Sequence, residues 1–472
     1  MAESFEAIVV GAGPNGLAAA IELARAGRSV LVVEAADTIG GGARTEEATL
    51  PGFRHDTCSA IHPLGILSPF LASLPLEERG VAWIDPPLAL AHPFDDGSAA
   101  ALERGVDATA ARLAPDTSTW SAVFGGYDDA RTLFGEILKP VRVPRHPLMM
   151  ARFGFDALQS AERFVGRFRG EHAKAIFAGC ASHAMMPLES AGTASFGMVL
   201  AIAAHAVGWP LPRGGSVAIV DALAAELRAL GGVIRTSERV TTLAQLPPAR
   251  AILFDVMPRS LADIAGAELP ESYVSALRRY RHGPGVFKID WALSGPVPWK
   301  ADECRRSATV HLAGTYDEIA AGERAAHEGR VSERPFVLFV QQSLFDDTRA
   351  PPGKHTGWAY CHVPNGSTVD MTAAIEAQVE RFAPGFRDLV LARRTLDATM
   401  LEAHDASFVG GDIGGGENSL RQTLARPLLQ WNPYITPNPR FFLASSATPP
   451  GGGVHGMCGY WAARAALRHA FG

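Results

Sequence analysis

The sequence predicts an α/β protein in which a parallel-sheet domain, built from separate chain segments, joins an α+β domain made of a mixed sheet and a helical cap. Three observations predict this fold. Residues 8–44 read as strand, glycine turn, helix and strand, similar segments return at 213–256 and 441–470, and the stretches between them have different patterns. We therefore expect the first domain at 1–97, 210–275 and 400–472, and the second at 98–209 (cap) and 276–399 (sheet).

The first segment has the pattern of a nucleotide-binding turn. An apolar strand at 8–10 enters Gly11-Ala12-Gly13-Pro14-Asn15-Gly16, which matches G-x-G-x-x-G between a strand and a helix. Its glycines permit the tight turn, the approach of backbone amides to a pyrophosphate, and close packing of the helix on the strand. The helix over about 17–26 directs its N-terminal amides at the phosphates. A second strand, 29–33, delivers Glu34, whose carboxylate can accept hydrogen bonds from ribose hydroxyls. We expect an adenine dinucleotide in a Rossmann-like domain.

A second glycine turn favours FAD over NAD. Gly40-Gly41-Gly42-Ala43-Arg44-Thr45 follows soon after Glu34. It combines exposed backbone amides with an arginine, which suits it to hold the same pyrophosphate from the other side. A dissociable NAD seldom needs this second contact, so the predicted cofactor is FAD.

Segments in the middle and at the end of the chain are expected to complete the first sheet. Arg213-Gly214-Gly215-Ser216 opens an amphipathic helix, and two short strands, 233–236 and 240–243, follow it. The continuous apolar run at 251–256 is typical of a buried parallel strand, and 441–444 is the last such strand.

The loop after the last strand contains a second G-x-G-x-x-G, formed by Gly451, Gly453 and Gly456. Only sixteen residues follow Gly456, so a further strand with a ribose-binding carboxylate does not fit after the final helix. We expect this loop to serve the same FAD. The N-terminus of the final helix would then stabilise the negative charge that the isoalloxazine gains on reduction.

The two insertions form the second domain. Apolar side chains at helical spacing between Met150 and Phe168 predict one helix of the cap, and 197–207 predicts another. The runs 285–293 and 336–340 predict strands. In the first of these strands Lys288 and Asp290 alternate with apolar residues, which predicts one polar surface face and one buried face.

Composition narrows the classes of partner and compartment. The net charge of -6, the pI near 6.2 and the lack of a Lys/Arg-rich block argue against nucleic acid. The five cysteines form no C-x-x-C pair, which argues against a disulfide framework, a redox dithiol and a metal site. Cys458 lies in the C-terminal loop, where packing is favoured over covalent flavin attachment. No long apolar run and no secretory pattern in residues 1–6 is found, so a cytoplasmic protein is expected.

These motifs resemble those of the phytoene desaturase-like flavoproteins, within the broader group that contains the flavin amine oxidases. The similarity extends over nearly the whole chain and is greatest to the branch of pyridine nucleotide-disulfide oxidoreductase domain-containing protein 2. The matching stretches are 11–34, 40–45, 51–56, 209–236, 287–299, 346–364 and 448–459. The resemblance implies non-covalent FAD, a discontinuous nucleotide domain and an apolar tunnel leading to the isoalloxazine. It also implies carbon-carbon redox chemistry on a lipophilic, often isoprenoid, substrate.

Motifs and resemblance together define a set of predicted site residues. The residues expected to bind the cofactor are Gly11, Gly13, Pro14, Asn15, Gly16, Glu34, Ala35, Gly41, Gly42, Ala43, Arg44, Arg213, Gly214, Gly215, Val240, Ser446, Gly453, Val454 and His455. Hydride transfer from a substrate carbon to flavin N5 needs few side chains, but a proton must also leave the neighbouring carbon. His455 and His62 are the candidate catalytic residues, since the ordinary histidine pKa lies near neutrality. A packing role is at least as frequent for both.

Other candidate residues have both a functional and a structural interpretation. Asp412, in a glycine-rich loop, could approach the ring, although a solvated turn aspartate is commoner. Lys288 could hold a water near N5, as the lysine of flavin amine oxidases does. A helix carrying Arg152, Arg163, Arg167 and Arg169 among phenylalanines could lie on a membrane, although a cap helix with solvated arginines is favoured.

Several functions remain open at this point. The first is an FAD-dependent dehydrogenase or desaturase that passes electrons to a quinone, to oxygen or to another acceptor. A polyene isomerase or saturase that uses reduced FAD, a flavin amine oxidase, and a non-catalytic flavoprotein that acts through a protein partner are the alternatives. Peripheral membrane contact stays open, and the sequence predicts neither the substrate nor the oligomeric state.

Overall fold

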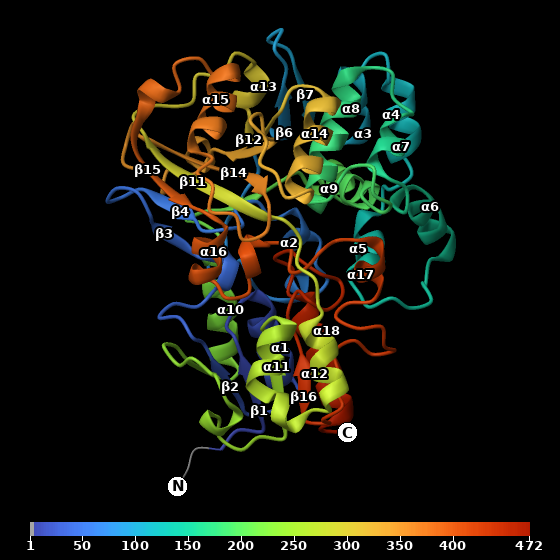
Figure 1. Cartoon of the computed structure of the whole chain (residues 1–472), viewed down its shortest axis with the longest axis vertical. Coiled ribbons are helices and arrows are strands. Elements are labelled where there is room, and N and C mark those ends of the chain that lie inside the picture. The colour runs from blue at the N-terminus through green and yellow to red at the C-terminus, as the bar shows by residue number, and fades with distance from the viewer. Residues whose placement is uncertain (1–3) are drawn as a thin grey trace.

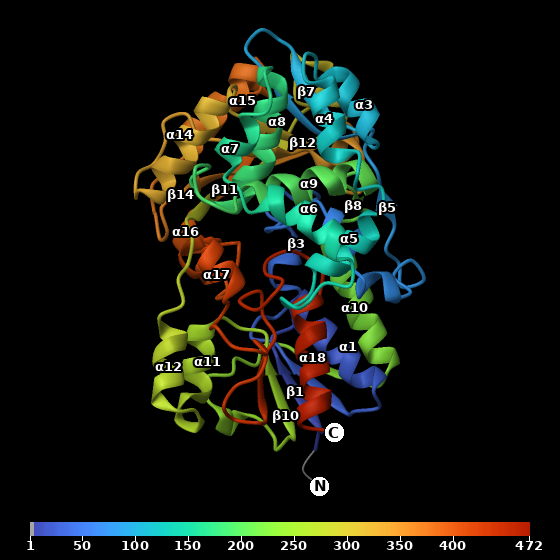
Figure 2. The same ribbon diagram turned by 90° about the vertical axis from the view of Figure 1, so that its right-hand side faces the viewer.

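The computed structural model has two domains stacked along its long axis (Figure 1). It describes residues 4–472. Met1, Ala2 and Glu3, which begin the first predicted domain segment and the N-terminal stretch inspected for a secretory pattern, lie outside the described residues. Segments from the start, middle and end of the chain meet in the lower domain, so this domain is discontinuous, as predicted (Figures 1 and 2).

The lower domain contains a five-stranded parallel sheet with the order β16-β10-β1-β2-β9. Its strands are β1 (Ala7–Val10), β2 (Val30–Val33), β9 (Val233–Arg235), β10 (Ala251–Phe254) and β16 (Phe441–Leu443). Val10 is paired with both Val33 and Phe254, so these strands end in register at one edge of the sheet. The predicted strand at 240–243 is wrong: Thr242 and Gln245 form a capping box there, which begins a short 3-10 turn instead.

Both faces of this sheet are covered, as its continuous apolar strands require. Helices α1 (Pro14–Arg25), α10 (Val217–Ala229) and α18 (Met457–His469) pack on one face. Helices α11 (Pro258–Ala265) and α12 (Glu271–Arg278) pack on the other. Along β1 the side chains alternate between the two cores, which explains why a polar face is missing from the sequence of this strand.

The upper domain contains a seven-stranded mixed sheet with the order β15-β11-β14-β13-β12-β6-β7. Its strands are β6 (Leu88–Pro93), β7 (Ala99–Leu102), β11 (Gly285–Leu293), β12 (Ser307–Leu312), β13 (Val337–Val340), β14 (His355–Val363) and β15 (Val390–Leu396). Strand β6 lies before residue 97, where the first domain segment was expected to end, so that boundary comes too late. Strand β6 forms a local hairpin with β7, and only its pairing with the distant strand β12 places this hairpin in the upper sheet, which is why the boundary could not be predicted from local sequence.

One face of this sheet is covered by helix α15 (Thr372–Phe382), whose apolar side chains pack on Phe287, Ile289 and Trp291 of β11. The opposite face is turned toward the lower domain and is called the site face below. Val286, Leu338, Val340, Trp358 and Tyr360 form an apolar cluster on it.

The cap consists of helices beside the upper sheet (Figure 2). They are α3 (Val106–Arg112), α4 (Thr117–Phe124), α5 (Ala130–Ile137), α6 (Pro147–Ala157), α7 (Ala161–Val165), α8 (Glu171–Ala181) and α9 (Ala194–Val207). The single predicted helix through Met150 and Phe168 is in fact two, α6 and α7, because Ser160 caps a new helix by accepting a hydrogen bond from Arg163 N. Arg167 of this region pairs with Asp156, and the arginines therefore do not share one helix face.

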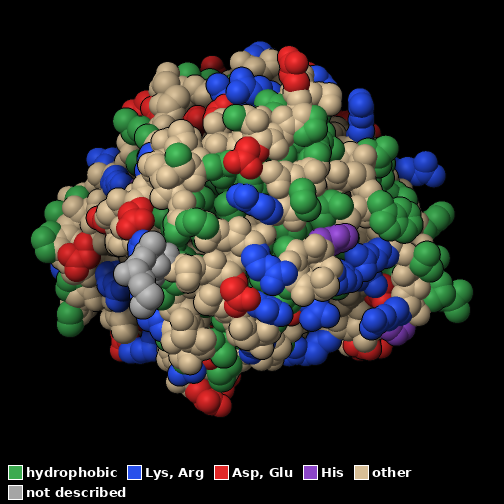
Figure 3. All heavy atoms as spheres, turned by 90° about the horizontal axis from the view of Figure 1, so that it is seen from below, with side chains coloured by type: hydrophobic (Ala, Val, Ile, Leu, Met, Phe, Trp, Pro, Cys, Tyr) green, Lys and Arg blue, Asp and Glu red, His purple; other side chains and the backbone are tan. Residues whose placement is uncertain are grey.

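Further short helices and strands flank these two domains or lie between them. They are α2 (Pro63–Leu67), α13 (Asp302–Arg305), α14 (Tyr316–His327), α16 (Ala398–His404), α17 (Leu420–Leu424), β3 (Thr45–Glu47), β4 (Arg54–Asp56), β5 (Trp83–Ile84) and β8 (Leu211–Pro212). Over residues 4–472, none of the helices combines the length and the apolar character that a membrane span requires. The face of the lower domain that is seen from below carries Lys and Arg side chains mixed with Asp and Glu (Figure 3).

Candidate functional site

One cavity of about 830 Å³ is lined by both domains. This volume lies in the upper part of the range of roughly 300–1,000 Å³ found for small-molecule sites. Its lower end follows the carboxyl edge of the first sheet, where β1, β2 and β10 are succeeded by Gly11, Glu34 and Asp255. Ligands of open α/β sheets bind at such an edge.

The first glycine turn has the predicted geometry. Gly11, Gly13, Pro14 and Asn15 line the cavity. Gly16 does not, and it serves packing instead: a Cβ there would lie 2.0 Å from the carbonyl oxygen of Gly11. This matches the packing role that the pattern assigns to the third glycine.

Glu34 and the second glycine turn lie beside the first turn. Glu34 and Ala35 line the cavity, and the Glu34 carboxylate accepts hydrogen bonds from Ala12 N at 2.7 Å and Ala36 N at 2.9 Å. Gly41, Gly42, Ala43 and Arg44 also line it. A Cβ on Gly41 would lie 3.5 Å from the Cα of Gly13, so the two turns face each other closely.

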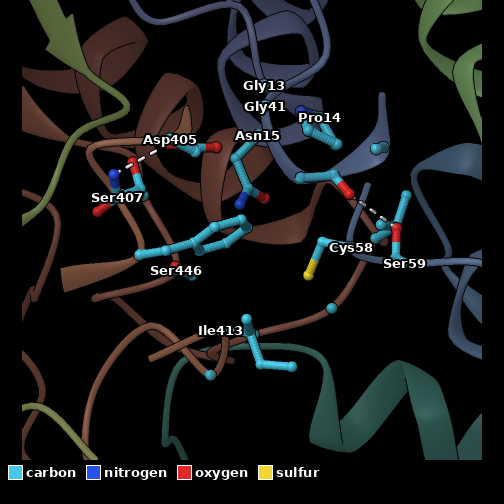
Figure 4. Close-up of a pocket in the computed structure, with 18 of the residues that line it drawn as sticks. Gly13, Pro14, Asn15, Gly41, Cys58, Ser59, Asp405, Ser407, Ile413 and Ser446 are labelled. Carbon is cyan, nitrogen blue, oxygen red and sulfur yellow. Dashed lines mark hydrogen bonds between the residues drawn. The ribbon is translucent and has the colours of Figure 1, made fainter. Parts of the chain in front are cut away.

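Figure 4 shows the space that these turns share with more distant segments. Gly13 and Gly41 lie together at one side, and Cys58 with Ser59 lies across from Asp405 with Ser407. Ile413 and Ser446 come from the C-terminal third of the chain. The predicted contact residues Val240, Ser446, Gly453 and Val454 all line the cavity. Segments from the start, middle and end of the sequence therefore meet around one space.

His455 lines the cavity, but its ring is used to hold the C-terminal loop. Its Nδ1 accepts a hydrogen bond from Met457 N, at the start of α18, at 3.0 Å. Burial lowers the pKa of His455 to about 4. Because the basic nitrogen is occupied by the backbone, the predicted role of His455 in proton transfer is corrected to a structural one.

His62 keeps a nitrogen that can accept a proton. Ser216 Oγ donates to Ser59 O at 2.5 Å, so the contact between His62 Nε2 and Ser216 Oγ, 2.8 Å long, must be donated by the histidine. This fixes the tautomer and leaves Nδ1 as the proton acceptor. His62 lines the cavity, and burial lowers its pKa to about 4.

The structure corrects the assignment of Arg213, Gly214 and Gly215 to the cofactor. None of these three is among the described residues that line the cavity. Instead, Gly214 N donates to Asp346 at 2.8 Å and Arg213 pairs with Asp347, so the turn binds a loop of the upper domain. The partner of the Gly214 amide is therefore a protein carboxylate and not the cofactor that was predicted.

The structure changes the predictions for Asp412 and Lys288 and agrees with the one for Cys458. Asp412 is buried and accepts hydrogen bonds from Gly283 N, Gly414 N and Gly416 N, so it organises its loop and is neither solvated nor exposed to the cavity. Cys458 lies behind the C-terminal loop with its Sγ against the carbonyl of Gly451, which favours packing over flavin attachment. Lys288 and Asp290 form a buried ion pair, not a surface face.

Lys288 is buried because the first domain covers the site face of the upper sheet. Its Nζ contacts Asp290 and lies 5.6 Å from the Trp358 ring, and Asp290 also lies 3.5 Å from His55 Nδ1. Burial lowers the pKa of Lys288, although Asp290 opposes the shift. Lys288 is not among the described residues that line the cavity, whereas its neighbour Trp358 is.

Asp255 is a cavity residue that sequence reasoning missed. It directly follows β10, and its Oδ2 accepts a hydrogen bond from Gly16 N at 2.7 Å within the glycine turn. Burial raises the pKa of Asp255 to about 8. The rule that polar residues at the carboxyl ends of parallel strands contact the ligand would have identified it.

The raised pKa makes the stability of the cofactor-free protein depend on pH through Asp255. The folded state holds a proton on this carboxyl up to about pH 8, whereas the unfolded chain releases it near pH 4, so stability falls as the pH rises between these values. Between pH 6 and 8 we expect the unfolding free energy of the parent to decrease by about 1–3 kcal/mol more than that of Asp255→Asn. Urea unfolding of both apoproteins at several pH values measures it, and parallel curves for the two proteins would contradict it.

The upper end of the cavity, called the substrate half below, is lined by the cap and by the site face of the upper sheet. Its lining residues are Ile137, Leu138, Phe153, His183, Met185, Ser195, Phe196, Val199, Leu200, Trp209, Thr309, Leu338, Val340, Trp358 and Tyr360. Asp, Glu, Lys and Arg are absent from this set of described residues. Sequence reasoning identified none of these as site residues, because only the fold brings their elements together.

Comparison with known proteins agrees with this arrangement. The NAD(P)-binding Rossmann-like domain model matches residues 9–72. The chain is homologous over nearly its whole length to pyridine nucleotide-disulfide oxidoreductase domain-containing protein 2 of Mus musculus, with 26% identity over 98% of this chain and 93% of that protein. It is also 28% identical to a phytoene dehydrogenase of Streptomyces griseus over 82% of this chain and 77% of that protein.

Solved structures share the fold. An oxidoreductase from Methanosarcina mazei superimposes with a TM-score of 0.67 at 15% identity, covering 98% of this chain and 99% of that one. Cyclohexylamine oxidase from Brevibacterium oxydans gives a TM-score of 0.59 at 16% identity, covering 99% of both chains. The predicted combination of a Rossmann-like domain with a mixed substrate sheet is therefore confirmed.

Proposed function

We propose that this chain is a phytoene dehydrogenase-like FAD-dependent oxidoreductase, a proposal supported by its homology to pyridine nucleotide-disulfide oxidoreductase domain-containing protein 2 and to a phytoene dehydrogenase. The proposed reaction is dehydrogenation of a carbon-carbon bond in a lipophilic, uncharged substrate. The observation that supports it most is that one continuous cavity joins two facing glycine turns at one end to the uncharged substrate half at the other.

The residues of the lower end fit FAD. Gly13 and Gly41 leave room that side chains would fill, and their turns offer backbone amides to a pyrophosphate. Glu34 and the loop at Glu238, Arg239 and Val240 would hold the adenosine side. Gly453 and Val454, ahead of α18, would hold the flavin side. When bound, FAD supplies the hydride acceptor of the reaction.

The chain's own residues would orient the substrate and exclude water. The substrate half surrounds a ligand with aromatic and aliphatic side chains such as Phe153, Phe196 and Val199, which favour an apolar body over a charged one. His62 Nδ1 would accept the proton that leaves the carbon next to the reacting one. Amine oxidation has less support, because Lys288 is bound by Asp290 and is separated from the cavity.

Anaerobic mixing of the FAD-loaded protein with uncharged isoprenoids tests this proposal. We expect the visible flavin absorbance to be lost and a product with one additional carbon-carbon double bond to appear. Bond rearrangement that requires prior flavin reduction would instead indicate an isomerase, and hydrogenation by the reduced protein a saturase. If no apolar compound changes the flavin or itself reacts, a non-catalytic role through a protein partner is indicated and the proposal fails.

His62→Gln tests the proton acceptor. The substituted side chain cannot take up a proton, so we expect the rate of flavin reduction by substrate to fall on the order of 100-fold while FAD stays bound. Stopped-flow absorbance measures the rate, and a flavin titration confirms binding. An unchanged rate would remove His62 from the chemistry.

Peripheral membrane contact is also proposed, as the source of the substrate. The segment around α6 exposes apolar side chains, with Val143 91%, Leu148 87% and Phe155 74% exposed, while Phe153 of the same helix lines the cavity. Such a patch suits contact with lipid. We expect the protein to float with liposomes and Leu148→Ser with Phe155→Ser to reduce flotation severalfold. Leu230→Ser, a partly exposed site of the first domain, is the control, and equal flotation of all forms contradicts this contact.

A further inference from the structure

The site face of the upper sheet presents two buried polar atoms to the cavity without a protein partner. Thr309 Oγ1 and Trp358 Nε1 form no hydrogen bond, although Thr309 is 1% and Trp358 3% exposed. Both residues line the substrate half. A buried polar group that lacks a partner costs about 1–3 kcal/mol, so native proteins usually satisfy such groups, a bound ligand being one of the means.

The strand register places Thr309 and Trp358 on either side of one residue, Val340. Thr309 of β12 is paired with Val340 of β13, and Val340 is paired with Trp358 of β14. Neighbouring strands lie about 4.8 Å apart, so the Cα atoms of Thr309 and Trp358 are about 10 Å apart, within reach of an indole and a hydroxyl that converge over a valine. Val310 packs in the opposite core, which confirms that Thr309 belongs to the site face.

From this arrangement we infer that the substrate carries a neutral oxygen function, a carbonyl or a hydroxyl, which binds between Thr309 and Trp358. This inference rests on the proposed function and narrows its substrate class. Trp358 Nε1 can only donate, so its partner needs a lone pair, which a protonated amine lacks. A carboxylate or phosphate would need a cation, and the substrate half contains no Lys or Arg among its described residues.

The neighbouring histidines do not change this charge balance. His183 lines the substrate half, and its Nε2 lies 3.4 Å from His311 Nε2. Burial lowers the pKa of His183 to about 3 and the pKa of His311 well below its usual value, so both are neutral at neutral pH. Lys288 and Asp290, behind Trp358, compensate each other. The substrate half therefore offers hydrogen bonds without net charge.

A probe series on one carbon skeleton tests the inference: p-menthane, menthone, menthol and protonated menthylamine. Dissociation constants come from the shift of the flavin spectrum in the FAD-loaded protein, with thermal stabilisation as a second readout. We expect menthone and menthol to bind roughly three- to tenfold more tightly than p-menthane, the difference made by one net hydrogen bond, and menthylamine to bind weakest. Equal or undetectable binding of the ketone, the alcohol and the hydrocarbon overturns the inference.

Three variants locate the oxygen. Thr309→Val removes one donor with little change of shape and should weaken menthone roughly three- to tenfold without weakening p-menthane. Trp358→Phe removes the other donor together with the pyrrole ring, so it should weaken menthone more than it weakens p-menthane. Thr356→Val is the matched control, since its hydroxyl is also buried and unpartnered in β14 but does not line the cavity. An equal loss for both probes, or an equal effect of the control, contradicts the inference. These experiments measure binding and not turnover. Failure of the inference can therefore be told apart from failure of the proposed reaction, which is tested by flavin bleaching.

Discussion

Gly459→Ala is expected to destabilise the protein and to weaken FAD binding, although the substitution adds a single methyl group. Gly459 lies in α18, and a Cβ there would lie 1.7 Å from the carbonyl oxygen of Asn15 and 3.0 Å from Ala19 N of α1. The two helices must therefore separate. Overpacking of this kind costs about 1–3 kcal/mol of unfolding free energy. Because α1 follows the glycine turn and α18 follows the C-terminal loop, both halves of the predicted FAD site would shift.

The matched control for this substitution is Gly135→Ala. Gly135 lies inside helix α5, and a Cβ there meets no atom within 4 Å. Alanine is favoured over glycine in a helix by about 1 kcal/mol, so this variant should be as stable as the parent or more stable. Urea unfolding and a flavin titration compare the two. If Gly459→Ala keeps the stability and FAD affinity of the parent, the close contact of α18 with α1 is contradicted.

Arg349→Leu is expected to cost about 3–5 kcal/mol of unfolding free energy, since it leaves buried carboxylates without their cation. Arg349 is 1% exposed and contacts Asp56, with Asp346 3.6 Å away. Asp56 also accepts hydrogen bonds from Thr45 Oγ1 at 2.6 Å and Ser216 N at 2.9 Å. Although burial alone would raise the pKa of Asp56, Arg349 holds it below its usual value. This network joins the two domains beside the cavity.

Arg213→Leu serves as the control for that network. Arg213 pairs with Asp347, in the same loop that carries Arg349, but both partners are largely exposed. Exposed ion pairs contribute about 0–1 kcal/mol, so this variant should unfold almost as the parent does. Similar losses for the two variants in chemical denaturation would contradict the assignment of the buried network.

The elements that could be predicted from sequence are those whose signal is local. The strands at 8–10, 29–33, 251–256 and 441–444 have continuous apolar runs, and their glycine turns have fixed spacing, so the first sheet and its cofactor edge followed from residues close together in the chain. The partner of a backbone amide in a turn, by contrast, depends on residues far away in the chain. The turn at 213–215 was assigned to the cofactor, but its Gly214 amide donates to a carboxylate more than a hundred residues away.

The substrate half could not be predicted, because long-range pairing creates it. Alternation along β11 correctly separated Lys288 and Asp290 from their apolar neighbours, but it could not tell that the first domain buries that face. Thr309 and Trp358 are unremarkable in sequence and become neighbours only through the register of three strands. His455 was misjudged for a related reason, since its partner is a backbone amide of the helix that follows.

The stoichiometry of FAD binding tests the central claim most directly, namely that both ends of the chain enclose one cofactor. Apoprotein is titrated with FAD, and quenching of flavin fluorescence gives the number of sites. The account predicts one FAD per chain, because the two G-x-G-x-x-G loops, at Gly11 and at Gly451, line the same cavity. Two sites per chain, or folded protein that binds no FAD, would contradict it.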